Sequence, residues 1–288
     1  MKALVTGAGG QLGRALQATA PAGVDLTALD RAALDIGDAP AVAARVHAIA
    51  PDLVINAAAY TAVDKAESDG AAARRINAEA PGHLATAAAA IGARFIHVST
   101  DFVFDGTSGA PYRPDHPTAP LGVYGATKLA GEQAVQAAHP TALIVRTAWV
   151  YGDTGHNFVR TMLRLMAERD EVRVVADQIG TPTYATGLAR ALWALDAAGA
   201  AGIHHWTDSG AASWYDFAVA IQEEALGLGL LARAVPVVPI ATSAYPTPAR
   251  RPSYSVLDKS AAVALVGGPA PHWRVHLREM LGVIKTHG

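Results

Sequence analysis

A glycine-rich turn near the start of the chain is the feature that most restricts its fold. The apolar run Lys2–Thr6 (KALVT) predicts a buried strand, and the next residues place Gly7, Gly10 and Gly13 in a GxxGxxG spacing before a helix that begins at about Gln11. Glycine tolerates positive φ and lets backbone amides approach a phosphate, and a helix N-terminus offers unpaired N–H groups to an anion. The strand–turn–helix context indicates dinucleotide binding, although an ordinary tight turn would also use these residues.

The alternation of apolar runs with alanine-rich stretches continues to about residue 150. The runs predict strands and the stretches between them predict helices. Strands are expected over Asp25–Asp30, Asp52–Ala58, Arg94–Thr100 and Ala142–Ala148, and helices over Asp38–Ala50, the region up to Gly92, and Tyr124–Ala138. Because the runs are continuously apolar, both faces of the sheet should be covered. The pattern predicts an α/β fold with a doubly wound parallel (Rossmann-type) sheet.

After residue 150 the alternation is less regular. Val172–Ala176 and Ile203–Thr207 predict strands, and the second is expected to return to the main sheet. Residues 236–254 contain too many prolines for a long helix. We therefore predict an NAD(P)-binding Rossmann domain over residues 1–150. Residues 151–288 should form a smaller C-terminal domain that is mainly substrate-binding, with some segments returning to the first domain.

The composition excludes several functional classes. The 288 residues include no cysteine, which rules out disulfides, thiolate nucleophiles and cysteine-based metal sites. A net charge of −2 with no basic face predicts no nucleic-acid partner. No apolar run reaches membrane-spanning length, and MKALVTGAGG lacks the long apolar core of a signal peptide. These observations predict a cytoplasmic globular protein without a membrane partner.

Polar residues at the end of the second predicted strand bear on the choice of cofactor. Asp30 ends this strand, where a carboxylate can accept hydrogen bonds from the adenosine ribose hydroxyls and favour NADH. Arg31 follows it and could instead contact the 2′-phosphate of NADPH. A solvated strand end is the other interpretation of Asp30. Asp35 and Ile36 could flank the adenine, and both NADH and NADPH remain open.

The third and fourth predicted strands end in residues that could reach a ligand, because ligands lie at the carboxyl ends of strands in open α/β sheets. Small residues up to Ala59 would let a cofactor pass close to the sheet, and Tyr60 and Thr61 follow them. At the next strand end, the hydroxyl of Thr100 could bond a substrate carbonyl oxygen. Asp101 could hold the substrate or simply cap the loop.

Tyr124 and Lys128 stand one helical turn apart and share a helix face. A free tyrosine has a pKa of about 10, and a neighbouring ammonium group should lower it. Tyr124 could then protonate a carbonyl oxygen while hydride reaches the carbon, and Lys128 could also bond the nicotinamide ribose. A packed tyrosine and a surface lysine would give the same spacing. Their position after the glycine turn and the hydroxyl-bearing strand end favours the catalytic interpretation.

Taken together, these motifs resemble the extended short-chain dehydrogenase/reductase superfamily and, within it, the dTDP-4-dehydrorhamnose reductases. The resemblance covers nearly the whole chain. It is carried by GAGGQLG, NAAAYTAVDKAE, INAEAP, HVSTDFVFDG, VYGATKLAGE, RTAWVYG, NFVRTML, DQIGTPT, SWYDFA and AYPTPARRPSYSVLD. It implies reduction of the 4-keto group of dTDP-4-dehydro-L-rhamnose by NADPH or NADH. Members of this family can use Mg²⁺, for which we assign no residue.

The resemblance also implies roles for individual residues. Thr100, Tyr124 and Lys128 would be catalytic, and Thr100, Asp101 and Trp149 would contact the nucleotide sugar. The implied cofactor contacts, with the Gly7 and Arg31 suggested above, are Gly7, Gly10, Gln11, Leu12, Asp30, Arg31, Asp35, Ile36, Ala59, Tyr60, Thr61, Tyr124 and Lys128.

Other functions use the same scaffold and stay open from sequence alone. A nucleotide-sugar epimerase or dehydratase would keep its NAD bound and recycle it. A non-catalytic regulatory subunit, as in the methionine adenosyltransferase β-subunit that the chain also resembles, would bind a protein partner. Arg250 and Arg251 could grip a diphosphate through bidentate bonds or be solvated surface charge. The protein could be a monomer or a homodimer.

Overall fold

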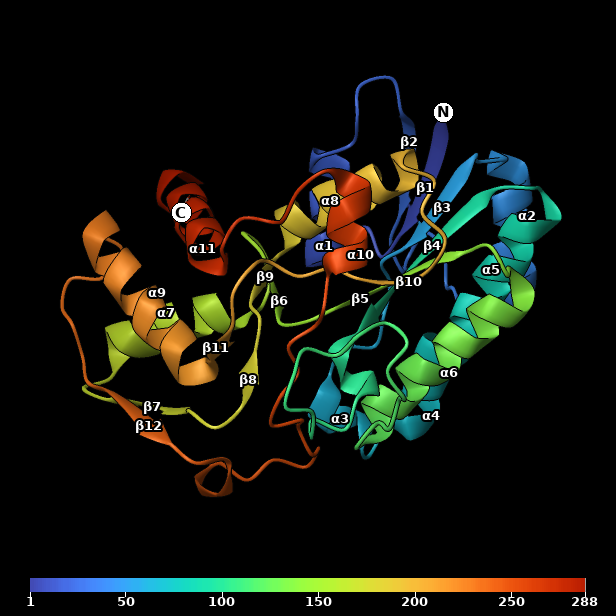
Figure 1. Cartoon of the computed structure of the whole chain (residues 1–288). Coiled ribbons are helices and arrows are strands. Elements are labelled where there is room, and N and C mark those ends of the chain that lie inside the picture. Colours follow the sequence, from blue (N-terminus) through green and yellow to red (C-terminus); the bar gives the residue numbers. More distant parts are fainter. Residues whose placement is uncertain (288) are drawn as a thin grey trace.

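A six-stranded parallel sheet forms the centre of the protein in the computed structural model, which describes residues 1–287 (Figure 1). The strand order is β10-β5-β4-β3-β1-β2. The strands are β1 (Lys2–Thr6), β2 (Asp25–Leu29), β3 (Leu53–Asn56), β4 (Arg94–Thr100), β5 (Leu143–Thr147) and β10 (Gly202–His205). The chain first runs outward from β1 to β2 and then crosses to β3 on the other side of β1. This reversal creates the crevice where such sheets bind ligands, and the predicted doubly wound α/β fold is confirmed.

Helices cover both faces of this sheet (Figure 1). On one face lie α1 (Gln11–Ala18), α8 (Ala185–Ala197) and α10 (Ser260–Val266), and on the other lie α2 (Ala39–Ile49), α5 (Ala80–Ala90) and α6 (Val123–Ala138). Successive strand residues serve opposite cores: Val5 packs on the α1 side and Leu4 on the α2 side. Because each strand supplies two buried faces, its sequence is apolar throughout.

A second body of structure follows β5 in the sequence. Helices α7 (Phe158–Glu168), α9 (Trp214–Leu228) and α11 (Trp273–His287) share a separate apolar core. Beside them, β7 (Val172–Val175) pairs in parallel with β12 (Val237–Ile240), which lies in the proline-rich segment. Two further short pairs are β6 (Val150–Tyr151) with β9 (Thr183–Tyr184), and β8 (Ile179–Gly180) with β11 (Ala212–Ser213).

The returning strand is confirmed, since β10 pairs in parallel with β5 at the edge of the main sheet. Helices α8 and α10, also from beyond residue 150, pack on that sheet. The division into two domains near residue 150 stays a prediction, with these three elements as the segments that return.

Several predicted boundaries are wrong, and hydrogen bonds explain two of them. The region expected to be one long helix up to Gly92 is divided into α3 (Val63–Ala66), α4 (Gly70–Arg74), a π-helical segment η1 (Arg75–Glu79) and α5. Helix α6 begins one residue early, at Val123, because the Glu67 carboxylate accepts the Val123 N–H at 2.8 Å. Strand β3 ends at Asn56 rather than Ala58, because the Asn56 side-chain oxygen accepts the Ala58 N–H at 3.2 Å in place of a strand partner. Single 3-10 turns, η2 (Asp101–Val103) and η3 (Thr242–Ala244), complete the described elements.

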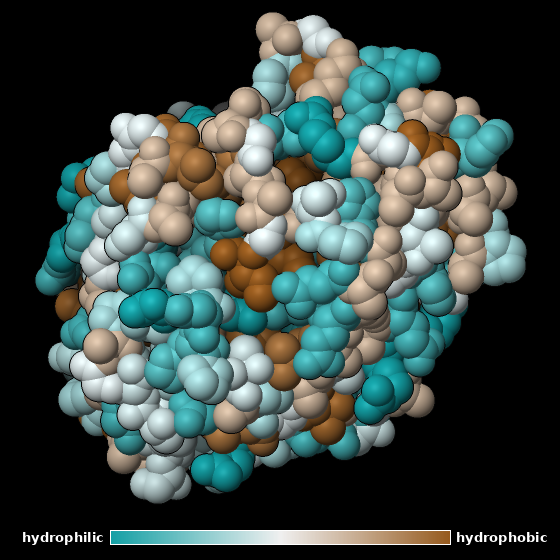
Figure 2. Space-filling model, turned by 45° about the vertical axis from the view of Figure 1, so that its right-hand side comes forward, coloured by the Kyte–Doolittle hydropathy of each residue, from teal (hydrophilic) through white to brown (hydrophobic). Residues whose placement is uncertain are grey.

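Hydrophilic and hydrophobic residues are interspersed on the face shown in Figure 2, and a group of strongly hydrophobic residues lies in a hollow near its middle. Among residues 1–287, no helix combines the length and apolar character needed to cross a membrane.

A close backbone contact between α6 and η1 leads to a stability prediction. A Cβ added at Gly131 would lie 2.0 Å from the Asn77 carbonyl oxygen, so Gly131→Ala must push α6 away from η1. We expect a loss of about 1–3 kcal/mol in the free energy of unfolding, larger than the gain in helix propensity of about 1 kcal/mol. Urea unfolding of the variant measures this difference.

The matched control is Gly282→Ala in α11, where an added Cβ meets no atom within 4 Å. This variant should gain about 0.5–1 kcal/mol. Equal stability of the two alanine variants would contradict the proposed steric contact.

Candidate functional site

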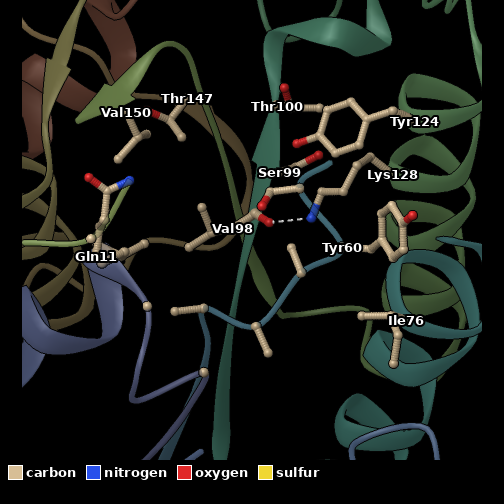
Figure 3. A pocket seen from close by; sticks show the side chains of 18 of the residues that line it. Gln11, Tyr60, Ile76, Val98, Ser99, Thr100, Tyr124, Lys128, Thr147 and Val150 are labelled. Atoms are coloured by element: carbon tan, nitrogen blue, oxygen red, sulfur yellow. Dashed lines mark hydrogen bonds between the residues drawn. The ribbon is translucent and has the colours of Figure 1, made fainter. Parts of the chain in front are cut away.

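A cavity of about 1040 Å³ lies at the carboxyl edge of the main sheet and brings every sequence-predicted site residue together. These residues are Gly7, Gly10, Gln11, Leu12, Asp30, Arg31, Asp35, Ile36, Ala59, Tyr60, Thr61, Thr100, Asp101, Tyr124, Lys128 and Trp149. They come from the last residue of β4, from the segments that follow β1, β2, β3, β4 and β5, and from α1 and α6. Figure 3 shows Gln11 on one wall and Tyr124 with Lys128 on the opposite one.

The glycine turn at the end of β1 fits a phosphate-bearing cofactor. Gly7 has a φ of +76°, and a Cβ there would lie 2.7 Å from the Ala58 nitrogen. A Cβ on Gly13 would lie 2.1 Å from the Gly7 carbonyl oxygen. The turn therefore packs directly against both α1 and the end of β3. No side chain caps the N-terminus of α1 at Gly10, so its first N–H groups are available to an anion.

The two acidic residues near β2 are held differently. One oxygen of the Asp30 carboxylate accepts the N–H groups of Ala32 and Ala33, at 3.0 and 2.9 Å, which orders the turn that also presents Arg31. The Asp35 carboxylate binds Arg75 at 2.6 Å, and this hydrogen bond lowers the pKa of Asp35. The carboxylate of Asp35 is thus committed to a protein partner, while one oxygen of Asp30 is left for a ligand.

Asn77, which the sequence analysis did not assign, fixes the backbone at Tyr60. The Tyr60 N–H donates to the Asn77 side-chain oxygen at 2.8 Å, and the Asn77 amide nitrogen donates to the Tyr60 carbonyl at 3.0 Å. Asn77 is 1% exposed and lies in the π-helical segment η1, a geometry that often marks functional sites. The Tyr60 hydroxyl donates to Asp69 at 3.1 Å.

Tyr124 and Lys128 project into the cavity from α6 (Figure 3). Lys128 is almost completely buried, and its Nζ donates to the Val98 carbonyl oxygen at 2.7 Å. The Lys128 Nζ also lies 3.4 Å from Nε2 of His97. The Tyr124 ring packs edge-on against Phe102, with 5.4 Å between the ring centroids.

The expectation that Lys128 lowers the pKa of Tyr124 is wrong when only the groups of the protein are considered. Burial raises the pKa of Tyr124 to about 12, and this outweighs the lowering effect of its hydrogen-bond contact with Thr100. Burial lowers the pKa of Lys128 to about 8, although the Glu132 charge acts in the opposite direction. Desolvation dominates the pKa of both groups, and the shortest hydrogen bond of Lys128 goes to the Val98 carbonyl. Tyr124 therefore keeps its proton at neutral pH, as a proton donor must.

Thr100 and Asp101 form one hydrogen-bonded unit at the end of β4. The Thr100 hydroxyl donates to Asp101 at 2.9 Å and accepts the Phe102 N–H at 3.2 Å. Asp101 is 1% exposed. Burial raises the pKa of its carboxyl to about 6, against the lowering effect of hydrogen bonds from Ser255 and Thr100. A carboxyl held in this way can accept a hydrogen bond from a sugar hydroxyl at neutral pH.

Trp149 stacks on Trp214, a second cavity residue that the sequence analysis did not assign. The ring centroids are 3.5 Å apart and the planes differ by 5°. Trp149 adopts a φ of +48°, which is strained for a bulky side chain. Trp214 is the first residue of α9, where Ser213 and Asp216 form a capping box. The stack therefore joins the end of β5 to the C-terminal helices across the cavity.

Arg251 also lines the cavity, but its guanidinium binds a carboxylate of this chain. Two of its nitrogens donate to the two oxygens of Asp64 in α3, at 3.1 and 2.7 Å. This bond lowers the pKa of Asp64. The bidentate geometry considered for a diphosphate is thus used to fasten the proline-rich segment to α3.

Among residues 1–287, no three histidine, aspartate or glutamate side chains gather in a way that could hold a metal ion.

Comparison with known proteins gives a consistent result. Residues 1–285 match the family model described as the RmlD substrate binding domain. The chain is 48% identical over 285 residues to the dTDP-4-dehydrorhamnose reductase of Burkholderia thailandensis, with 95% of this chain and 96% of that protein covered. It is 43% identical over 296 residues to the Escherichia coli protein of the same name, with 99% of each covered.

Solved structures show the same similarity. The dTDP-4-dehydrorhamnose reductase of Clostridium acetobutylicum superposes with a TM-score of 0.93 and 42% identity, covering 99% of each chain. That of Bacillus anthracis, in complex with NADP, gives 0.92 and 38%, covering 97% of this chain and 98% of that one. The UDP-glucose 4-epimerase of Thermus thermophilus gives 0.83 at 20% identity, with 99% of each chain covered, and shows only a shared fold.

The buried Asp101 carboxyl should lower the stability of the folded protein at neutral pH, where it is ionised. Its native pKa of about 6 lies above the ordinary 3.8, so the native state binds more protons than the unfolded state, and stability falls as pH rises through this window. Asp101→Asn should remove that cost. We expect it to raise the free energy of unfolding at pH 7 by up to about 3 kcal/mol, with the gain vanishing below about pH 4. Urea unfolding across this pH range measures the gain.

Asp115→Asn is the control. Asp115 is exposed, and its hydrogen bond to Arg113 lowers the pKa of its carboxyl, so the small effect should have the opposite sign at pH 7. A gain for Asp101→Asn that is independent of pH would contradict the assignment of its cost to ionisation.

Proposed function

The chain belongs to the RmlD substrate binding domain family, and from this premise we propose that it reduces the 4-keto group of dTDP-4-dehydro-L-rhamnose to give dTDP-L-rhamnose, with NADPH as reductant. The observation that carries the proposal is the meeting of Thr100, Tyr124 and Lys128 with a phosphate-accepting glycine turn in one cavity. Relatives named dTDP-4-dehydrorhamnose reductase, 40–50% identical over nearly the whole chain, support the choice of substrate.

The residues of the cavity divide into two groups in this proposal. The glycine turn and the N-terminus of α1 would hold the cofactor diphosphate. Asp30 would lie at the adenosine ribose, and Arg31 would hold its 2′-phosphate. NADPH, when bound, supplies the hydride that reaches C4 of the sugar. Trp149, supported by Trp214, forms the wall against which the nucleotide sugar packs, and Asp101 accepts a hydrogen bond from it.

Tyr124 gives its phenolic proton to the 4-keto oxygen as that oxygen gains charge. Thr100 orients the carbonyl through its hydroxyl, which lies beside Asp101 at the end of β4. Lys128 bonds the nicotinamide ribose and places a positive charge near the phenolate that Tyr124 becomes, which stabilises it. The O–H bond of the product forms as the O–H bond of the phenol breaks. In this proposal the protein acts in the cytoplasm as a monomer or a homodimer.

Turnover of dTDP-4-dehydro-L-rhamnose, followed by loss of NADPH absorbance and identification of the product sugar, tests the proposal. Tyr124→Phe should lower kcat by about 10²–10⁴-fold because it removes the proton donor, while NADPH affinity should stay within a few fold. Tyr215→Phe, a tyrosine outside the cavity lining, should leave kcat unchanged. Undiminished turnover by Tyr124→Phe would refute the mechanism.

The same assay separates the two rival functions. An epimerase or dehydratase would convert nucleotide sugars without consuming NADPH in proportion to product. A regulatory subunit would show no turnover with any 4-keto-6-deoxy sugar nucleotide and would capture a synthetase partner. NADPH consumption equal to the amount of dTDP-L-rhamnose formed excludes both.

Arg31 gives a separate prediction for cofactor choice. Arg31 lines the cavity beside Asp30, where the adenosine ribose is expected, and a hydrogen bond between charged groups contributes about 1.5–3 kcal/mol. Arg31→Ala should therefore weaken NADPH binding by about ten- to a hundredfold and leave NADH binding nearly unchanged. Fluorescence titration of both cofactors measures this, with Arg45→Ala, outside the cavity lining, as the control. Equal losses for NADPH and NADH would show that Arg31 does not read the 2′-phosphate.

A further inference from the structure

A chain of buried polar groups runs beneath the floor of the cavity, from β1 to α6. The Thr6 hydroxyl donates to the Asn56 side-chain oxygen at 2.8 Å, and the Asn56 amide nitrogen lies 3.1 Å from Nδ1 of His97. Nε2 of the same ring lies 3.4 Å from Nζ of Lys128. None of these four residues is more than 2% exposed. Thr6, Asn56 and His97 have no part in the reaction as proposed so far.

One backbone amide fixes the direction of this chain. The Ala58 N–H, which can only donate, reaches the Asn56 side-chain oxygen at 3.2 Å. The oxygen and nitrogen of the Asn56 amide are thereby distinguished, and its nitrogen must donate to Nδ1 of His97. Burial, reinforced by the charge of Lys128, lowers the pKa of His97 well below its usual value, so the ring is neutral. A neutral ring that accepts at Nδ1 carries its proton on Nε2.

The Nε2–H of His97 therefore points at Lys128. An ammonium group has three donors and no acceptor, so a hydrogen bond from His97 can form only when Lys128 is a neutral amine. The protonated lysine instead faces a second donor. This contact favours loss of the Lys128 proton, while the bond to the Val98 carbonyl keeps the amine in place.

The charged groups around Lys128 do not cancel this preference. Glu132, one turn further along α6, favours the ammonium form. However, both of its oxygens bind Arg146 on β5, at 2.9 and 2.7 Å, and one also accepts the Ser99 hydroxyl at 2.5 Å. Tyr124 keeps its proton and is neutral. The charge of Asp101, at the end of β4, acts on Tyr124.

We propose that His97, held as its Nε2–H tautomer by Asn56, is a positioning residue of the reductase that offers a hydrogen bond to the neutral amine of Lys128 and none to its ammonium. The role rests on the proposed function, in which Tyr124 loses its proton to the substrate. Lys128 can then release a proton toward the phenolate: its N–H bond breaks, the phenol O–H bond forms again, and the neutral amine accepts the waiting Nε2–H of His97. The dyad stabilises the neutral amine that remains when Lys128 has given up its proton, and a proton from solvent restores the ammonium before the next turnover.

The substitution Asn56→Asp tests this with almost no change of shape. It keeps the oxygen that accepts from Thr6 and Ala58, and it replaces the donor at His97 by an acceptor. The His97 proton should move to Nδ1, so that Nε2 becomes an acceptor for the Lys128 ammonium. We expect ¹⁵N NMR to show the Nε2–H tautomer in the wild type across the neutral range and the Nδ1–H tautomer in the variant.

The titration midpoint of Lys128 is read together with the His97 tautomer, because the carboxylate of Asn56→Asp would by itself favour the Lys128 ammonium. The chain has five lysines (Lys2, Lys65, Lys128, Lys259 and Lys285), so ε-¹³C labelling resolves them, and Lys128→Arg assigns the signal. Asn56→Asp should raise the Lys128 midpoint by about one pH unit or more, a tenfold increase in proton affinity. Lys259 is partly buried and likewise has a pKa lowered by burial. It is the internal control, and its titration midpoint should stay unchanged. His205→Gln is a second control and should leave the Lys128 midpoint unchanged, because this buried histidine bonds the Tyr112 carbonyl rather than the lysine.

The alkaline limb of the kcat profile should follow the Lys128 midpoint upward in Asn56→Asp. An Nδ1–H tautomer in the wild type would overturn the proposal even if the variant failed to fold. A tautomer that moves while the Lys128 midpoint stays fixed would overturn it equally. These NMR measurements need no substrate, so failure of the proposed reduction would appear separately, as absent turnover with the expected tautomer and midpoints.

Discussion

The hydrogen bond from Lys128 to the Val98 carbonyl joins helix α6 to strand β4, and the rest of the site depends on it. It places a cation in the interior, where charge is costly. The surrounding residues offset only part of that cost. Glu132 is largely committed to Arg146, and His97 presents a donor rather than an acceptor. Lys128 is consequently fixed in position, while its ammonium form is only weakly favoured over the neutral amine. Such a lysine suits a site in which a neighbouring tyrosine donates a proton.

Much of the fold could be predicted from the sequence because the constraints on it are local. Each central strand serves two apolar cores, as Leu4 and Val5 show, and this makes the strands continuous apolar runs. The glycine spacing after β1 follows from the contact between Gly7 and the end of β3. The misplaced boundaries depend on distant partners. The start of α6 is set by Glu67, 56 residues earlier in the chain. The break at η1 surrounds Asn77, which bonds the backbone of Tyr60.

The same difference between local constraints and contacts with distant residues explains which parts of the site could be predicted. Residues carried by motifs at strand ends all line the cavity, because parallel strands deliver their carboxyl ends to one edge. The ionisation of Tyr124 could not be read from its spacing to Lys128, since burial and the Val98 carbonyl decide it. The roles of Trp214 and His97 could not be predicted from the sequence for a similar reason. Their partners, Trp149 and Asn56, are 65 and 41 residues away in the chain.

The position of β10 has a consequence for how the protein is made. This strand closes the free side of β5, yet it follows β5 by more than fifty residues. During synthesis β5 must wait with an open hydrogen-bonding edge until residue 205 has left the ribosome, and such an edge invites pairing with other chains. The late return of β10 and α8 thus makes the nascent protein most vulnerable to misassembly in the interval between its fifth strand and its tenth.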